Sequence, residues 1–223
     1  MTVWFKYLFS TSLLVLLLLI TPSAHALEIT ALYGLNYAAP SETTSTGNAQ
    51  WTGDAASTFG VLVAIPVLGP IFDLESGLIY ENQKSERPNS GTTYFESTKN
   101  IQLPILFRAN FDEYIGVGVG YYFGFAQGDL DTSNNNVETV LTYDAANRKK
   151  LDSGLLFDLR VKYPLTPSFA LVFDGRYQHG LMNLSSAAAD SYATRSIQMF
   201  LGFSFTTQTM SSATQAPNRA SRE

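Results

Sequence analysis

The sequence predicts an all-β fold: an eight-stranded antiparallel up-and-down β-barrel that crosses a membrane and follows a cleaved N-terminal signal peptide. Three observations lead to this prediction. The chain begins with an export signal, eight later segments alternate between apolar and polar residues, and the connections between them are alternately long and short. Period-two alternation is typical of β-strands, and alternately long and short connections are typical of bacterial membrane barrels.

Residues 1–26 are predicted to be the signal peptide. The single charge of Lys6 precedes an apolar block at 13–20, and Ala24 and Ala26 supply the small residues that favour cleavage before Leu27. The alternative is a retained membrane anchor, but the apolar stretch is only about 14 residues long, against about 20 for a spanning helix. We therefore expect three regions: a signal peptide at 1–26, a barrel at 27–205 and a disordered polar tail at 206–223.

Eight segments of the mature chain follow the period-two pattern of strands. In the clearest one, Ile115, Val117 and Val119 alternate with small residues such as Gly116 and Gly118. An even number of strands suits a closed bacterial barrel. The predicted strands are 29–37, 59–67, 72–80, 95–107, 115–125, 155–163, 169–177 and 197–205.

The polar face of these strands is predicted to point into the barrel. A soluble β-sandwich also alternates, but this polar face combines glycine with charges of both signs, which fits the filled interior of an eight-stranded barrel. The outward tyrosines near strand ends fit the aromatic girdles found at membrane surfaces; these are Tyr37, Tyr80, Tyr163 and Tyr177. The expected lumenal charge network consists of Asp73, Glu75, Glu96, Arg108, Asp158, Arg160, Lys162, Asp174 and Arg176.

The lengths of the connections give an independent argument for a membrane barrel. The predicted long connections are 40–55, 84–92, 128–147 and 181–193, and the short ones are 68–70, 109–113 and 165–168. Outer-membrane barrels have short periplasmic turns and longer external loops. With a periplasmic N-terminus, every long connection therefore falls outside the cell.

Composition excludes several classes of function. The chain has no Cys and two His, which removes disulfides, thiolate sites and multi-histidine metal centres, and its net charge of −5 gives no basic surface for nucleic acid. His179 is the only mature histidine, and no serine adjoins it to complete a lipid-hydrolysing pair. We expect no enzymatic activity, no cofactor and no metal.

Several motifs resemble the PorT-like outer-membrane barrel family. The segment 100–108 (NIQLPILFR) resembles its proline-containing strand, 116–124 (GVGVGYYFG) resembles its glycine and aromatic strand, and 176–184 (RYQHGLMNL) resembles its arginine-tyrosine segment. The resemblance covers the mature chain to about Phe205. It implies an eight-stranded outer-membrane barrel and supplies no activity, because one fold hosts many functions.

We therefore expect a monomeric outer-membrane barrel with a plugged polar lumen and a structural or interaction role through its external loops. Its partners would be outer-membrane lipid, the barrel-insertion machinery, which reads the aromatic end of the last strand, and an extracellular or envelope protein. The chain is too short for the roughly 16 strands of a diffusion porin. Two alternatives stay open: a soluble periplasmic β-barrel that binds an apolar ligand, with the opposite faces inside, and an enzyme acting on outer-membrane lipid.

Overall fold

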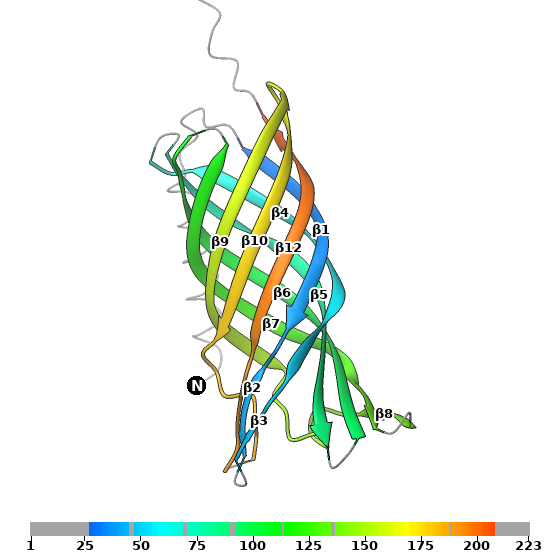
Figure 1. Cartoon of the computed structure of the whole chain (residues 1–223). Coiled ribbons are helices and arrows are strands. Elements are labelled where there is room, and N and C mark those ends of the chain that lie inside the picture. Colours follow the sequence, from blue (N-terminus) through cyan, green and yellow to red (C-terminus); the bar gives the residue numbers. More distant parts are fainter. Residues whose placement is uncertain are drawn as a thin grey trace, which may run out of the picture. The chain divides into compact units, whose positions relative to one another are not determined.

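The computed structural model describes residues 27–207, apart from short gaps at 45–46, 69–70, 90–91, 113, 135–136 and 188. The signal peptide predicted at 1–26 and all but the first two residues of the predicted tail lie outside the described residues. Eight strands form the barrel (Figure 1). They are β1 (Glu28–Ala38), β4 (Thr52–Pro66), β5 (Phe72–Asn89), β6 (Thr92–Asn110), β7 (Ile115–Asn134), β9 (Leu151–Thr166), β10 (Phe169–Gly180) and β12 (Arg195–Thr206).

The barrel is closed by hydrogen bonds around its whole circumference. Neighbouring strands pair antiparallel in the order β6-β5-β4-β1-β12-β10-β9-β7, and a further pairing of β6 with β7 joins the two ends. The first and last strands pair along their full length, from Glu28 opposite Thr206 to Ala38 opposite Ser196. Closure leaves no unpaired edge, which a sheet inside a bilayer requires. The predicted fold class and its eight strands are confirmed. Across the described part of the chain, no helix is long and apolar enough to cross a membrane.

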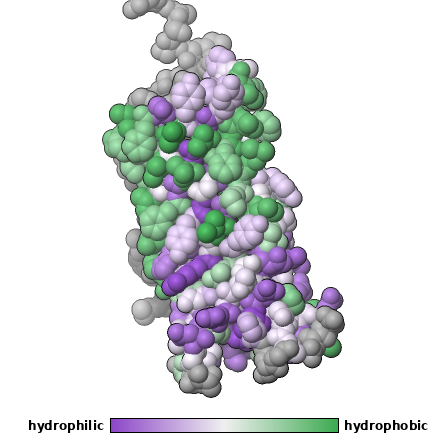
Figure 2. Space-filling view, in the orientation of Figure 1, coloured by the Kyte–Doolittle hydropathy of each residue, from purple (hydrophilic) through white to green (hydrophobic). Residues whose placement is uncertain are grey.

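The outside of the barrel is apolar and the inside is largely polar. Large apolar side chains such as Val119, Leu159 and Phe203 are about half exposed, whereas Gln102 and Asp174 are buried. In Figure 2 the hydrophobic residues gather over the upper part of the barrel and the hydrophilic ones over its lower end. This distribution is the one predicted for a membrane barrel, and it is the reverse of the soluble ligand-binding alternative.

Three strands are much longer than the sequence predicts. β5 has 18 residues, β6 has 19 and β7 has 20, whereas about 9 to 11 are enough to cross a bilayer. The prediction of a loop at 84–92 is therefore wrong, because β5 and β6 remain paired as far as Asn89 and Thr92. Beyond the membrane both faces of a strand meet water, so the apolar alternation that marks a strand disappears while its hydrogen bonds continue.

The other long connections also contain strands. β2 (Ser41–Thr44), β3 (Gly47–Ala49) and β11 (Ser191–Ala193) form a separate three-stranded sheet. β8 (Val137–Leu141) extends the hairpin of β7, as the alternation at 137–143 predicts. All four strands lie at the lower end of the barrel in Figure 1. We call this the long-loop end; the opposite end carries only short turns.

Candidate functional site

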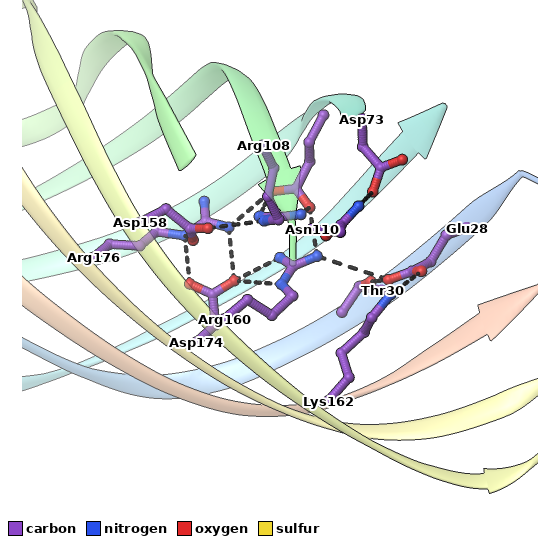
Figure 3. A network of polar contacts seen from close by, with 11 residues as sticks. Glu28, Thr30, Asp73, Arg108, Asn110, Asp158, Arg160, Lys162, Asp174 and Arg176 are labelled. Carbon is purple, nitrogen blue, oxygen red and sulfur yellow. Dashed lines mark hydrogen bonds and ion pairs between the residues drawn. The ribbon is translucent and has the colours of Figure 1, made fainter. Parts of the chain in front are cut away.

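A cluster of buried ion pairs crosses the barrel interior (Figure 3). It joins side chains from β5, β6, β9 and β10, all of them almost fully buried. We call it the lumen ion cluster; its members are Glu75, Arg108, Asp158, Arg160, Asp174 and Arg176. The sequence prediction names all six, and the structure brings them together.

Glu75 lies at the centre of the lumen ion cluster and contacts all three arginines. Its carboxylate oxygens lie 2.9 Å from Arg108 Nη1, 2.6 Å from Arg160 Nη1 and 2.9 Å from Arg176 Nη2. Asp158 accepts from Arg108 Nε at 2.9 Å. Asp174 is shared, because Arg160 and Arg176 both donate to it. Three arginines thus meet three carboxylates, so the cluster carries no net formal charge.

This balance matters because a buried charge is costly unless it is paired and hydrogen-bonded. Each arginine presents several N–H donors in a fixed planar arrangement, which suits contact with more than one carboxylate. Removing a single member would leave an uncompensated charge in the lumen. The cluster is therefore a set of mutually dependent contacts.

Small residues on β7 make room for the lumen ion cluster. A Cβ at Gly116 would lie 2.6 Å from Arg108 Cδ, and one at Gly118 would lie 2.5 Å from Leu106 Cδ2. Both distances are shorter than real contacts allow. Gly116 and Gly118 are thus explained by the arginine and leucine side chains that cross the lumen against them.

A second pair of contacts lies at the short-turn end. Lys162 Nζ contacts Glu28 Oε2 at 2.8 Å, and Asn110 Nδ2 donates to Asp73 Oδ2 at 2.6 Å. Lys162 and Asp73 are predicted members of the lumenal network, but their partners Glu28 and Asn110 are not. Glu28 is detectable in the sequence, because it occupies the polar face of the first predicted strand.

Glu96, although predicted to belong to the lumenal network, lies apart from it near the outer end of β6. Its partners there are Arg148 and Tyr192. Tyr192 Oη donates a hydrogen bond to Glu96 at 3.3 Å, and Arg148 Nη2 forms an ion pair with Glu96 at 3.8 Å. We call this group the outer-end cluster. Its members are Glu42, Trp51, Arg87, Glu96, Arg148 and Tyr192.

The outer-end cluster joins connections that are distant in the sequence. Glu42 on β2 accepts from Arg87 at 2.7 Å, from Trp51 Nε1 at 2.8 Å and from Arg148 at 3.5 Å. Arg87 lies over the Trp51 ring at 4.9 Å, and Arg148 lies over the Tyr192 ring at 3.3 Å. Such cation–π contacts add to the ion pairs when they are shielded from water. The cluster therefore holds the long-loop end in one arrangement.

Burial sets the electrostatics of the outer-end cluster. It raises the pKa of the Glu96 carboxyl above its ordinary 4.5, and the charge of Arg148 only partly offsets this. Burial, together with the negative charge of Glu96, raises the pKa of the Tyr192 hydroxyl well above 10.0. The hydroxyl therefore stays protonated and remains a donor to Glu96.

A pocket of about 540 Å³ opens beside the outer-end cluster, over the outer parts of β4 to β8. Its lining mixes carboxylates, one lysine and apolar side chains, including Asp54, Lys84, Phe95, Asp131, Glu138 and Val140. Sequence analysis does not find this pocket, because it is formed by strand extensions that the sequence presents as polar loops.

His179 is the one histidine among the described residues. Its side chain lies on the outer face of β10, where its Nδ1 is 3.4 Å from the Tyr177 hydroxyl. Among the described residues, no group of three or more His, Cys, Asp or Glu could hold a metal ion.

A closed barrel with an apolar exterior and a charge-filled interior defines the class of outer-membrane β-barrel proteins. The family described as outer membrane protein beta-barrel domain matches residues 21–186, and the chain belongs to this family. The protein is located in the outer membrane of a Gram-negative cell. A comparison with curated proteins finds no matching sequence.

Solved structures with a similar fold include those of the proteins Ail and OprG. The attachment invasion locus protein Ail of Yersinia pestis, solved with the heparin analogue sucrose octasulfate, is 10% identical with a TM-score of 0.42, over 82% of this chain and 99% of Ail. OprG of Pseudomonas aeruginosa is 10% identical with a TM-score of 0.47, over 83% of this chain and 97% of OprG. The likeness concerns the fold alone.

Proposed function

We propose that this outer-membrane barrel is plugged and acts through its extracellular end, as an interaction protein rather than a channel or an enzyme. The observation that carries the proposal is the contrast between the barrel interior and the long-loop end. The lumen is filled by the lumen ion cluster, whereas the long-loop end is built into an ordered structure with an open pocket. The narrower resemblance to PorT-like barrels remains a prediction.

The filled interior supports a plugged barrel. Alongside the lumen ion cluster, two groups of buried apolar side chains occupy the space between the strands: Leu32, Leu62, Ile79, Val172 and Phe200 in one, and Leu106, Tyr122 and Leu156 in the other. Eight-stranded barrels have interiors just wide enough for side chains to fill. A solute would have to displace paired charges and packed apolar groups together.

The ordered long-loop end supports an interaction role. Its pocket of about 540 Å³ lies within the range of about 300 to 1,000 Å³ typical of ligand sites. Phe95 and Val140 give apolar contact area, while Lys84 and Glu138 give charges of both signs. The outer-end cluster fixes the neighbouring connections, which lowers the ordering cost of binding. The partner we expect is an extracellular or envelope protein, bound by the monomeric barrel.

Two measurements test the proposal. In planar bilayers, the refolded protein should give no stable conductance, and a steady open conductance would contradict a plugged lumen. Because the chain lacks cysteine, Glu138→Cys places a single thiol at the pocket and Pro167→Cys places one at a short turn. A membrane-impermeant maleimide added to intact cells should label the first variant alone. Labelling of the second alone would invert the orientation and remove the extracellular role.

A further inference from the structure

Strand β8 has a free edge in the part of the chain that the structure describes. It is the last strand in the order of its sheet, and β7 is its one neighbour there. Figure 1 shows β8 at the margin of the long-loop end. An unpaired edge presents backbone groups that can pair with a further strand, and proteins usually protect such edges with lysine, proline or a bulge. The sequence of β8 (VETVL) has neither lysine nor proline, and its register with β7 has no bulge.

The backbone groups of Glu138 and Val140 point to this free edge. Thr139 O accepts a hydrogen bond from Thr132 Oγ1 of β7 at 2.9 Å, so the carbonyl of Thr139 points toward β7. In an antiparallel pair, the N–H and C=O groups of successive residues point alternately to the two sides of a strand. Those of Glu138 and Val140 therefore point away from β7. Each of the two residues offers one donor and one acceptor to a partner strand.

The face of β8 that carries Glu138 and Val140 is acidic. Both residues line the pocket of about 540 Å³, and Asp131, whose ion pair with a lysine of β6 is half exposed, lies directly opposite Val140 on β7. Asp54 adds a further carboxylate to the lining, whereas Lys84 adds a cation. Within the described chain, neither Glu138 nor Asp54 forms an ion pair with a lysine or arginine. This face therefore favours basic side chains from a partner.

The opposite face of β8 is mostly apolar. It carries Val137, Thr139 and Leu141, because side chains alternate between the two faces of a strand. Val137 is 63% exposed. β8 pairs with residues 130–134 of β7, the last part of a strand about twice as long as a bilayer requires. The apolar face of β8 therefore belongs to the extension beyond the bilayer, where exposed apolar side chains are typical of protein-binding surfaces.

We propose that the free edge of β8 binds an extended segment of a partner protein by strand addition, and that basic and apolar side chains alternate along this segment. In strand addition, backbone hydrogen bonds give affinity and alternate side chains give specificity. The basic side chains would contact Glu138 and Asp131, with their aliphatic parts against Val140. The apolar side chains would pack on Val137 and Leu141. This inference rests on the proposed interaction role of the long-loop end and names the chemistry of the partner.

A second copy of this chain is a poorer occupant of the edge. Antiparallel pairing of two β8 strands would bring their acidic faces to the same side of the sheet. Like charges on adjacent strands are unfavourable, and each copy would add Glu138 and Asp131 to that side. A basic segment would instead meet these carboxylates with opposite charge.

The test is binding of synthetic peptides to the refolded full chain, measured by fluorescence anisotropy. A heptapeptide of alternating lysine and valine should bind at least about tenfold more tightly than one of alternating glutamate and valine. The lysine–valine peptide with N-methylated amides keeps its charge and side chains but cannot donate backbone hydrogen bonds. It should bind no better than the glutamate–valine peptide. Equal binding of the lysine–valine peptide with and without N-methylation would overturn strand addition and indicate attraction by charge alone.

Two variants of one residue locate the binding on β8. Val140→Pro removes an N–H that points away from β7, where an edge strand tolerates proline, and should abolish peptide binding. Val140→Ala, the matched control, keeps this N–H and should retain most of the binding. Undiminished binding by Val140→Pro would overturn the proposal. If this variant does not refold, Glu138→Lys serves instead: it should lose the preference for the lysine–valine peptide, and an unchanged preference would count against the proposal.

Failure of this proposal can be told from failure of the proposed function. External labelling of Glu138→Cys without peptide binding would overturn strand addition and leave the extracellular role intact. Peptide binding to the refolded protein without external labelling would contradict that role and keep the edge as a binding site. Self-association of the wild type that Val140→Pro abolishes, measured by sedimentation, would assign the edge to a second copy and so overturn the proposal.

Discussion

Replacing Arg160 with Met should destabilise the barrel strongly. Arg160 is 1% exposed and contacts both Glu75, at 2.6 Å, and Asp174. Methionine has a similar unbranched shape and leaves little empty space, so the main effect is the loss of charge. The lumen ion cluster then holds two arginines and three carboxylates, which leaves one negative charge uncompensated inside the barrel.

The size of the effect follows from this imbalance. Removing one partner of a buried ion pair costs about 3 to 5 kcal/mol. In a chain of this length each kcal/mol corresponds to about 2 to 4 °C in the unfolding temperature, so Arg160→Met should lower it by about 6 to 20 °C. The double variant Arg160→Met, Asp174→Asn restores equal numbers of charges. It should therefore be less destabilised than the sum of the two single variants.

Heat-modifiability provides the assay. Folded barrels migrate differently from boiled ones on gels, so the folded fraction can be followed against temperature or denaturant for all four proteins. Our reasoning would be refuted by an unfolding temperature of Arg160→Met within about 2 °C of the wild type, less than about 1 kcal/mol. Strict additivity in the double variant would show that the two residues do not depend on each other.

Three further predictions concern other parts of the molecule. Gly118→Val should lower the free energy of unfolding by about 1 to 3 kcal/mol, because its Cβ would lie 2.5 Å from Leu106. Gly124→Ala should lower it less in the same assay, because its Cβ meets no atom closer than 3.4 Å. Since burial raises the pKa of Glu96 from 4.5, the folded outer end binds a proton that the unfolded chain releases, and its stability should fall as the pH rises from 4.5 through the raised pKa. Hydrogen exchange at the outer-end cluster should show this dependence, and Glu96→Gln should lack it; the same dependence in the variant would assign it to another group. His179→Ala should leave the outer-membrane lipid profile unchanged, and a missing lipid product would instead indicate an enzyme.

The barrel strands could be predicted because the membrane constrains both of their faces. A residue such as Val119 meets lipid and its neighbour Gly118 meets the Leu106 side chain inside the barrel, so apolar and small residues must alternate. The same constraint identifies Arg108 and Asp174 as residues whose side chains face the lumen. Once the strands are placed, the direction of each side chain follows from period two.

The partners inside the lumen could not be predicted in the same way. Which arginine meets which carboxylate depends on the stagger between strands. Glu75 contacts Arg176 across 101 sequence positions, and nothing local indicates that pairing.

The long-loop end was the least predictable part. Glu42, Arg87 and Arg148 occur in polar stretches with no alternation, although they form one cluster. Strand segments beyond the bilayer meet water on both faces, so they lack the apolar alternation on which strand prediction depends. Ion pairs and cation–π contacts hold these segments together instead. The sequence analysis places Glu96 in the lumenal charge network, whereas its partners are Tyr192 and Arg148 at the long-loop end. Its strand could be recognised from the sequence, but its position along the barrel axis could not.

The length of the β5–β6 hairpin has a practical consequence for the cell surface. From Ile101, which pairs with Tyr80 of β5, β6 continues to Thr92, a distance of about 30 Å along its axis. Both strands of the hairpin therefore continue past the length that crosses a bilayer. With the orientation proposed above, a short epitope inserted between Asn89 and Thr92 should be displayed to antibodies on living cells, without disturbing the lumen or the closure of the barrel.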